Sequence, residues 1–91
     1  MKIYLIAIQM LSEGRRTQIV RIIQSIGGGW ARITNTAWCI KVANTTTAEI
    51  RNKITSQLDI QSDERLIVVD ITNSSWASYY LPKDVADWLK Q

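Results

Sequence analysis

The nine residues from Lys2 to Met10, KIYLIAIQM, constrain the fold more than any other stretch of this chain. As an extended strand they divide their apolar side chains between two faces: Ile3, Leu5 and Ala7 on one, and Tyr4, Ile6 and Ile8 on the other. A strand that is apolar on both faces lies in a sheet that is covered on both sides. The rest of the chain, or a second chain, must therefore supply a cover for each face.

Two later segments have the apolar spacing of amphipathic helices. Residues 15–26 follow a polar loop at residues 11–14 and carry isoleucines at positions 19, 22, 23 and 26, while residues 47–58 carry Ile50, Ile54 and Leu58. Thr46 precedes Glu49 by three residues, which is the spacing of a capping box at a helix start. Gly27-Gly28-Gly29 ends the first helix, and we expect a left-handed glycine there.

The remaining elements are predicted as strands and one short helix. Strands are expected at residues 2–9, 30–34, 37–42 and 65–71, and a last helix at 82–90, opened by Pro82. Asn35-Thr36 joins the two middle strands, and asparagine tolerates the positive φ of a tight hairpin. Residues 76–80 are expected to form a short extra strand or an extended arm.

The order of these elements defines the fold class. A β-α-β-β-α-β order with right-handed crossovers gives an α+β, ferredoxin-like sandwich, with a four-stranded antiparallel sheet and both helices on one face. We expect a single domain over residues 1–91, with a core at 1–72 and a C-terminal arm and short helix at 73–91. The second face of the sheet is then left for a partner subunit or the C-terminal segment to cover.

Composition restricts location and partners. The single cysteine, Cys39, cannot form an intramolecular disulfide, and we expect a cytoplasmic protein. No apolar run approaches the roughly 18 residues of a membrane-spanning helix, so no membrane partner is expected. The net charge of +3 permits contact with nucleic acid without requiring it.

The first strand and the segments after it carry a family resemblance. Ile3–Ile8 runs through a loop into Arg15-Arg16 and a helix that ends at a glycine, and the strand Thr36-Ala37-Trp38-Cys39-Ile40 follows. Over about residues 1–72 this order resembles the ferredoxin-fold superfamily of the small CRISPR adaptation subunit, virulence-associated protein D and some ribonuclease toxins and antitoxins. The C-terminal pattern is similar to that of small bacterial proteins labelled SinR-like: Leu81, Pro82, Val85, Trp88 and Leu89.

The resemblance implies a homodimer formed across the sheet faces. In nuclease members it also implies a metal-binding aspartate at the end of the first strand. Here that strand ends in Ile8, Gln9 and Met10, none of which is acidic. A neutral amide is a poor ligand for Mg²⁺, which prefers carboxylate oxygen. This departure argues against the nuclease activity of those members, and no metal or cofactor is expected.

The chemistry available to the chain is narrow. It contains no histidine, which removes the usual general base near neutral pH and argues against an enzyme. Cys39 on its apolar strand is predicted to be a core residue. Asp70, near the end of the last strand, is expected either to pair with Lys2 or to lie exposed on the strand face, and Asp63-Glu64 is expected to be a solvated turn.

Basic and aromatic side chains are the candidate binding residues. Two cations at a helix start oppose the helix dipole, so Arg15 and Arg16 are candidates for holding a phosphate together with the free N–H groups there. The predicted nucleic-acid or anion site comprises Arg15, Arg16, Arg32 and Lys41. Tyrosine and tryptophan are enriched at interfaces, and the predicted dimer contact comprises Tyr4, Trp76, Tyr79 and Tyr80.

Three functions remain open at this point. The favoured hypothesis is a non-catalytic, dimeric module that binds a nucleic acid or a protein, in a bacterial toxin–antitoxin or defence and counter-defence setting. The alternatives are a metal-dependent endoribonuclease of the toxin or CRISPR-adaptation type, and a simple RNA-binding module. The missing acid at Gln9 separates the first hypothesis from the nuclease.

Overall fold

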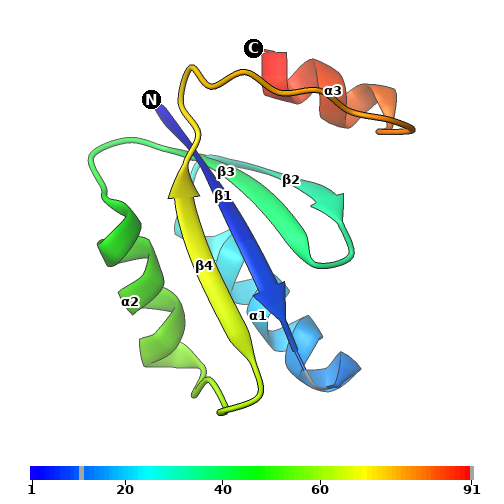
Figure 1. Cartoon of the computed structure of the whole chain (residues 1–91). Helices are drawn as coiled ribbons and strands as arrows, with labels where there is room; N and C mark the ends of the chain where they lie inside the picture. Colours follow the sequence, from blue (N-terminus) through cyan, green and yellow to red (C-terminus); the bar gives the residue numbers. More distant parts are fainter. Residues whose placement is uncertain (11, 91) are drawn as a thin grey trace.

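A computed structural model describes residues 1–10 and 12–90 of the chain (Figure 1). It contains one four-stranded sheet, with two helices behind it and a third at one end (Figure 1). In chain order the elements are β1 (Lys2–Gln9), α1 (Glu13–Ile26), β2 (Gly29–Thr34), β3 (Ala37–Val42), α2 (Thr47–Gln57), β4 (Arg65–Asp70) and α3 (Lys83–Lys90). The predicted α+β class is confirmed, and the strand boundaries differ from prediction by at most one residue.

The sheet is antiparallel and has the order β2-β3-β1-β4. The N-terminal strand β1 is central: Tyr4 lies opposite Ile40 on β3 and opposite Asp70 on β4. This order is consistent with a ferredoxin-like fold. It leaves β2 and β4 as the two edge strands.

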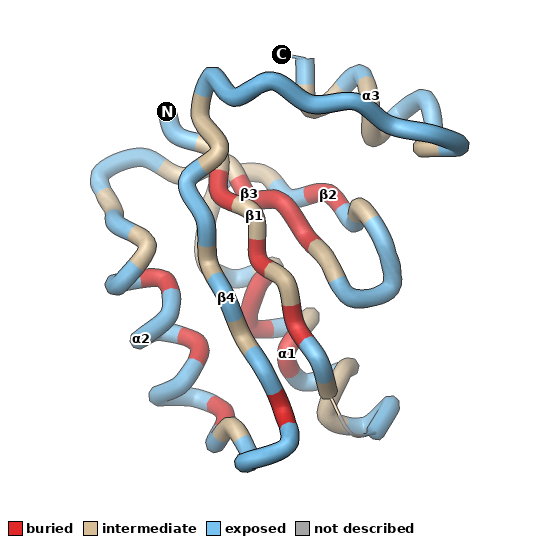
Figure 2. The backbone as a smooth tube through the Cα atoms, in the orientation of Figure 1, coloured by how far each residue is buried: buried red, intermediate tan, exposed pale blue. Residues whose placement is uncertain are grey.

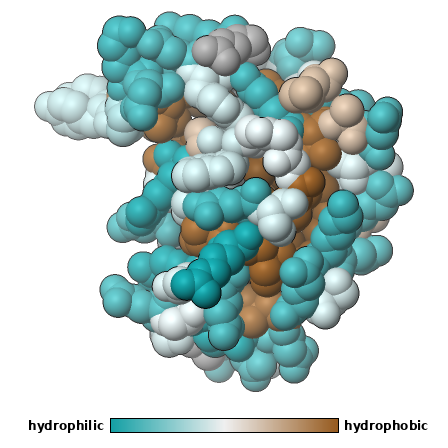
Figure 3. Space-filling view, turned by 180° about the vertical axis from the view of Figure 1, so that it is seen from behind, coloured by the Kyte–Doolittle hydropathy of each residue, from teal (hydrophilic) through white to brown (hydrophobic). Residues whose placement is uncertain are grey.

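The core lies between the sheet and the two helices behind it. Tyr4, Ile6 and Ile8 of β1 point into it, and buried positions recur on the sheet-facing sides of α1 and α2 (Figure 2). Burying each isoleucine stabilises the fold by about 1.5–3 kcal/mol in transfer terms. The helical side is largely hydrophilic, with apolar atoms showing in the seam between the helices (Figure 3).

Side-chain caps set the two helix starts. The Oγ of Ser12 accepts the Arg15 backbone N–H at 3.3 Å, so α1 begins at Glu13, two residues before the predicted start. The predicted loop at 11–14 is therefore wrong for Glu13 and Gly14, and Leu11 lies outside the described residues. At α2 the predicted cap is confirmed, because Thr46 Oγ1 accepts the Glu49 N–H at 3.1 Å.

Gly27 ends α1 for a reason other than the predicted one. Its φ is −146°, an extended value that any residue adopts, so the left-handed conformation is wrong. A Cβ at this position would lie 2.4 Å from Val42 Cγ2 and 3.1 Å from the Lys41 carbonyl oxygen. The glycine is therefore required by close packing of the helix end against β3.

The β2–β3 hairpin also differs from prediction. Asn35 does not have a positive φ, whereas Asn44, Asn73 and Tyr80 do. The β2–β3 register shifts between Arg32 and Thr34, which marks a bulge or irregularity just before the turn. Thr34 Oγ1 accepts the Thr36 N–H at 3.2 Å and closes the turn.

The face of the sheet opposite α1 and α2 is only partly covered, and we call it the open face. On its β2–β3 half, Ala31 and Cys39 are buried, and Trp88 of α3 lies against Gly29 and Lys41. On its β1–β4 half, Ile67 and Val69 are exposed. The C-terminal helix therefore closes one corner and leaves an apolar strip uncovered.

Residues 76–80 form an exposed arm without strand pairing, which is one of the two predicted conformations. None of the helices within residues 1–10 and 12–90 has the length and apolar character needed to cross a bilayer.

Candidate nucleic-acid interface

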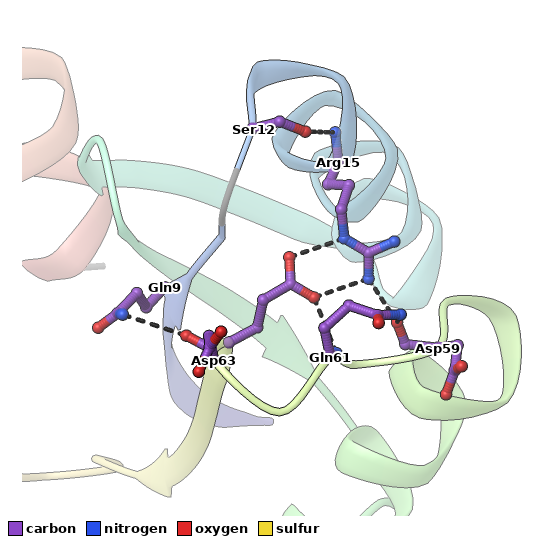
Figure 4. Close-up of polar contacts among 7 residues, drawn as sticks. Gln9, Ser12, Arg15, Asp59, Gln61 and Asp63 are labelled. Carbon is purple, nitrogen blue, oxygen red and sulfur yellow. Dashed lines mark hydrogen bonds and ion pairs between the residues drawn. The ribbon is translucent and has the colours of Figure 1, made fainter.

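The two adjacent arginines of α1 point in different directions, because successive residues of an α-helix are rotated by about 100°. Arg15 turns toward the segment before β4 (Figure 4). Its Nε and one terminal nitrogen donate to the two carboxylate oxygens of Glu64, both at 2.7 Å, and it also donates to the Asp59 carbonyl. This bidentate bond raises the pKa of the Arg15 guanidinium above its ordinary value.

This contact corrects two sequence-based predictions. Arg15 holds an internal carboxylate, so its guanidinium is not presented to an external anion. Glu64 is not solvated as predicted, because its side chain is fully enclosed. Its Oε1 also accepts the Gln61 backbone N–H at 2.9 Å. The Arg15–Glu64 ion pair therefore connects the loop before β4 to the first turn of α1.

Gln9, the residue in place of the expected acid, is exposed at the end of β1. Its Nε2 donates to the Asp63 carbonyl oxygen at 3.3 Å (Figure 4). In the described part of the chain, no group of three or more histidine, cysteine, aspartate or glutamate side chains is placed to hold a metal ion.

Lys41 caps the C-terminal helix. Its Nζ donates to the Trp88 carbonyl oxygen at 2.6 Å and lies 4.3 Å from the centre of the Trp88 ring. A cation at a helix C-terminus interacts favourably with the helix dipole. The structure thus gives Lys41 an internal partner and separates it from the predicted anion site.

Asp70 pairs with Lys2 as predicted, with 3.7 Å between Oδ2 and Nζ. The pKa of the Asp70 carboxyl is lowered most by a hydrogen bond from the Thr72 side chain and next by one from the Thr72 backbone. The positive charge of Lys2 lowers it further. The backbone bond from Thr72 N–H to Asp70 Oδ1 is 3.0 Å long. Asp70 therefore has a structural role at the end of β4.

The other two candidate cations lie together. Arg16 on α1 and Arg32 on β2 line a shallow cleft of about 340 Å³ between the helix and the β2–β3 hairpin. The remaining lining residues are neutral: Thr17, Val20, Gln24, Asn35 and Trp38. Neither arginine forms an ion pair with any residue in 1–10 or 12–90. The cleft therefore presents two positive charges and no negative one.

Arg32 is held in place at the lip of this cleft. It donates one hydrogen bond to Asn35 Oδ1, and its guanidinium carbon lies 5.9 Å from the centre of the Trp38 ring. Because arginine carries five N–H donors, most of them remain available to a ligand. A fixed guanidinium with spare donors suits a phosphate group.

Two tryptophans adjoin the same arginine. The rings of Trp30 and Trp38 lie 5.5 Å apart, inclined by 49°. Trp38 is buried, whereas Trp30 is 45% exposed on the edge strand β2. An exposed indole next to Arg32, which forms no ion pair in the described chain, is a combination of aromatic and cationic groups typical of nucleic-acid surfaces.

Sequence reasoning places Arg16 and Arg32 among the candidates and misses Gln24, Asn35 and Trp30. Two patterns contain the signal. Arg16, Val20 and Gln24 recur every four residues and so lie on one flank of α1. Trp30 and Arg32 alternate along β2 and so share one face of that strand.

The predicted dimer residues fall into two groups. Tyr4 is 1% exposed in the core, and its hydroxyl donates to the Thr45 carbonyl oxygen at 2.8 Å, so it is removed from any surface contact. The arm residues are exposed: Trp76 by 41%, Tyr79 by 86% and Tyr80 by 90%. The Tyr79 and Tyr80 rings lie 4.4 Å apart. Their place in a dimer stays a prediction.

Cys39 is buried on β3, and burial raises the pKa of its thiol to about 11 from 9.0. Between these two pH values the unfolded chain loses the thiol proton and the folded chain keeps it. The native state then binds more protons, so the free energy of unfolding must fall as pH rises through this window.

We therefore expect urea-unfolding midpoints to decline more steeply between about pH 9 and 11 in the wild type than in Cys39→Ala. The alanine variant is less stable at neutral pH, but its pH profile is flatter. Alkylation by iodoacetamide should likewise be slow in the folded protein and fast in urea. Parallel pH profiles for the two proteins would contradict this assignment.

No family model matches the chain, and no curated protein matches its sequence.

Proposed function

We propose that this chain is a non-catalytic, dimeric binding module whose ligand is a nucleic acid. The observation that carries the proposal is the cleft with Arg16 and Arg32, which has two guanidinium groups without ion-pair partners in the described part of the chain and no acidic lining residue. Phosphate is the ligand that such a pair recognises best, because each guanidinium matches two phosphate oxygens.

The position of Arg16 strengthens this proposal. It lies in the first turn of α1, where the helix dipole adds positive potential. The only acidic residue in that turn is Glu13, which is exposed and absent from the cleft lining. The electrostatic potential of the cleft is therefore set by the arginines and the helix start together.

A carboxylate of a protein partner also fits a guanidinium group, but the half-exposed Trp30 ring beside Arg32 favours a nucleic acid, whose bases stack on aromatic rings. The exposed apolar strip on β4 supports the dimeric part of the proposal instead.

The double variant Arg16→Ala/Arg32→Ala is expected to bind a single-stranded oligonucleotide of about a dozen residues roughly tenfold more weakly at low salt. The slope of log K against log salt should fall by about 0.7 for each phosphate group that the variant no longer neutralises. Fluorescence anisotropy over a salt series measures both quantities. Arg15 is left intact, because removing it would leave the enclosed Glu64 carboxylate without its guanidinium partner.

The matched control is Arg51→Ala/Lys53→Ala, which removes the same charge from exposed positions of α2. This control should keep most of the affinity, because α2 does not line the cleft. Equal losses of affinity in the two double variants would mean that binding reflects net charge alone, and the cleft would then have no special part in it.

A further inference from the structure

The edge strand β2 carries two adjoining hollows, and their chemistry differs. The first is the cleft with Arg16 and Arg32. The second, of about 330 Å³, is lined by Trp30, Ala31, Arg32, Asp84, Val85 and Trp88. Arg32 lines both hollows, and the Trp38 ring of the first lies 5.5 Å from the Trp30 ring of the second. A ligand can therefore extend from one hollow to the other over Arg32.

The two hollows differ in the charge of their lining residues, and this difference suits them to different parts of a ligand. The first contains two arginines and no acid, so it favours phosphate. The second contains Asp84, which repels phosphate but accepts hydrogen bonds from base amino groups. The second also offers two indole rings, Trp30 and Trp88, and one face of Trp88 is already occupied by Lys41. Trp30 is thus the better stacking surface for a base.

Resting on the nucleic-acid function proposed above, we infer that the ligand is single-stranded, with a phosphate on Arg16 and Arg32 and an unstacked base on Trp30. In a duplex the bases are stacked on one another, and their faces are closed to a protein side chain. A single strand exposes those faces, and every base can stack on an aromatic ring. The amides of Gln24 and Asn35 line the phosphate-binding cleft as further hydrogen-bonding groups.

The packing of Trp30 suits this role. Its ring rests on the buried Trp38, so its orientation is set by the core, while 45% of the residue stays open to solvent. The fold requires only an apolar side chain over Trp38 at position 30, and this requirement does not demand tryptophan. Leucine would also cover Trp38, so Trp30→Leu removes the stacking surface and keeps an apolar cover.

The test compares four probes of equal length: oligodeoxyuridine, oligouridine, an abasic deoxyribose-phosphate chain and a DNA duplex. The wild type should bind the base-bearing single strands roughly tenfold more tightly than the abasic chain. Trp30→Leu should lose this preference. Gln57→Leu, which introduces a leucine at an exposed position of α2, should retain it. Oligodeoxyuridine and oligouridine differ only in the 2′-hydroxyl, so the tighter of the two identifies DNA or RNA as the ligand.

Equal affinity for base-bearing and abasic chains, or tighter binding of the duplex, would overturn the single-strand inference. So would a preference that survives in Trp30→Leu. In each of these cases an effect of Arg16→Ala/Arg32→Ala would still uphold nucleic-acid binding. Absence of binding to every probe would overturn the proposed function itself. Circular dichroism and thermal melting of each variant confirm that the fold is intact.

Discussion

The Glu64→Ala variant is expected to have a free energy of unfolding about 3 kcal/mol lower than that of the wild type. This corresponds to a fall in Tm of roughly 12–24 °C for a domain of this size. The side chain of Glu64 is fully enclosed and accepts two hydrogen bonds from Arg15 and one from the Gln61 backbone. Its removal leaves these donors without their acceptor and detaches the loop before β4 from α1. Thermal and urea unfolding followed by circular dichroism measure the change in stability.

Asp63→Ala is the matched control, because it removes an exposed carboxylate from the adjacent position. The Gln9 contact of Asp63 uses the backbone carbonyl and survives the substitution, so a change of no more than about 0.5 kcal/mol is expected. Replacing both partners, as Arg15→Met/Glu64→Met, should recover part of the stability, since a buried ion pair can be replaced by apolar groups of similar size. Equal stability of Glu64→Ala and Asp63→Ala would show that the pair does not anchor the loop.

Ile67→Lys is expected to convert a dimer into a monomer. Ile67 is 58% exposed and Val69 38% exposed on β4, next to Leu5 and Ala7 of β1 on the open face. A hollow of about 440 Å³ continues this strip to the end of β1, with Ala7, Thr36 and Ile67 in its lining. Such a strip usually marks an interface, and a two-fold dimer of the chain is the simplest assembly that covers it.

Light scattering at low micromolar concentration should give twice the 10.4 kDa chain mass for the wild type and one chain mass for Ile67→Lys. The lysine lies on an edge strand at an exposed position, so the isolated subunit should keep its fold. Thr55→Lys adds the same charge to an exposed position of α2 and should leave the dimer intact. A wild-type mass of one chain would refute the dimer.

Much of the fold could be predicted from the sequence because its signals are local. The isoleucine spacing of α1, the capping threonine of α2 and the β-branched run of β4 each identify an element without reference to the rest of the chain. The prediction errors occur where a contact between residues far apart in the sequence determines the local structure. A glycine is required at position 27 because Val42 and Lys41 leave no room for a Cβ atom there. The partner of Arg15 is Glu64, which lies 49 residues away in the sequence.

The candidate site was predictable only in part for the same reason. Two of the four predicted cations, Arg16 and Arg32, line one cleft, and the other two are engaged within the fold. Residue type could not separate these pairs, because an arginine that binds an internal carboxylate and one that faces solvent have the same sequence signature. The prediction for Tyr4 fails because both faces of β1 are apolar, and the sequence does not say which face meets the helices.

The central position of β1 has a consequence for how the chain folds as it is made. β1 is synthesised first, yet one of its two neighbours is β4, and the ladder between them joins Tyr4 to Asp70. At about 5–20 residues per second, the nascent strand waits roughly 3–12 s before β4 can pair with it. Throughout that interval the edge of β1 that faces β4 lacks its native hydrogen-bonding partner. The β1–β3 pair and α1 are synthesised before β4, so an early sheet on the ribosome is limited to β1, β2 and β3 until the last strand is made.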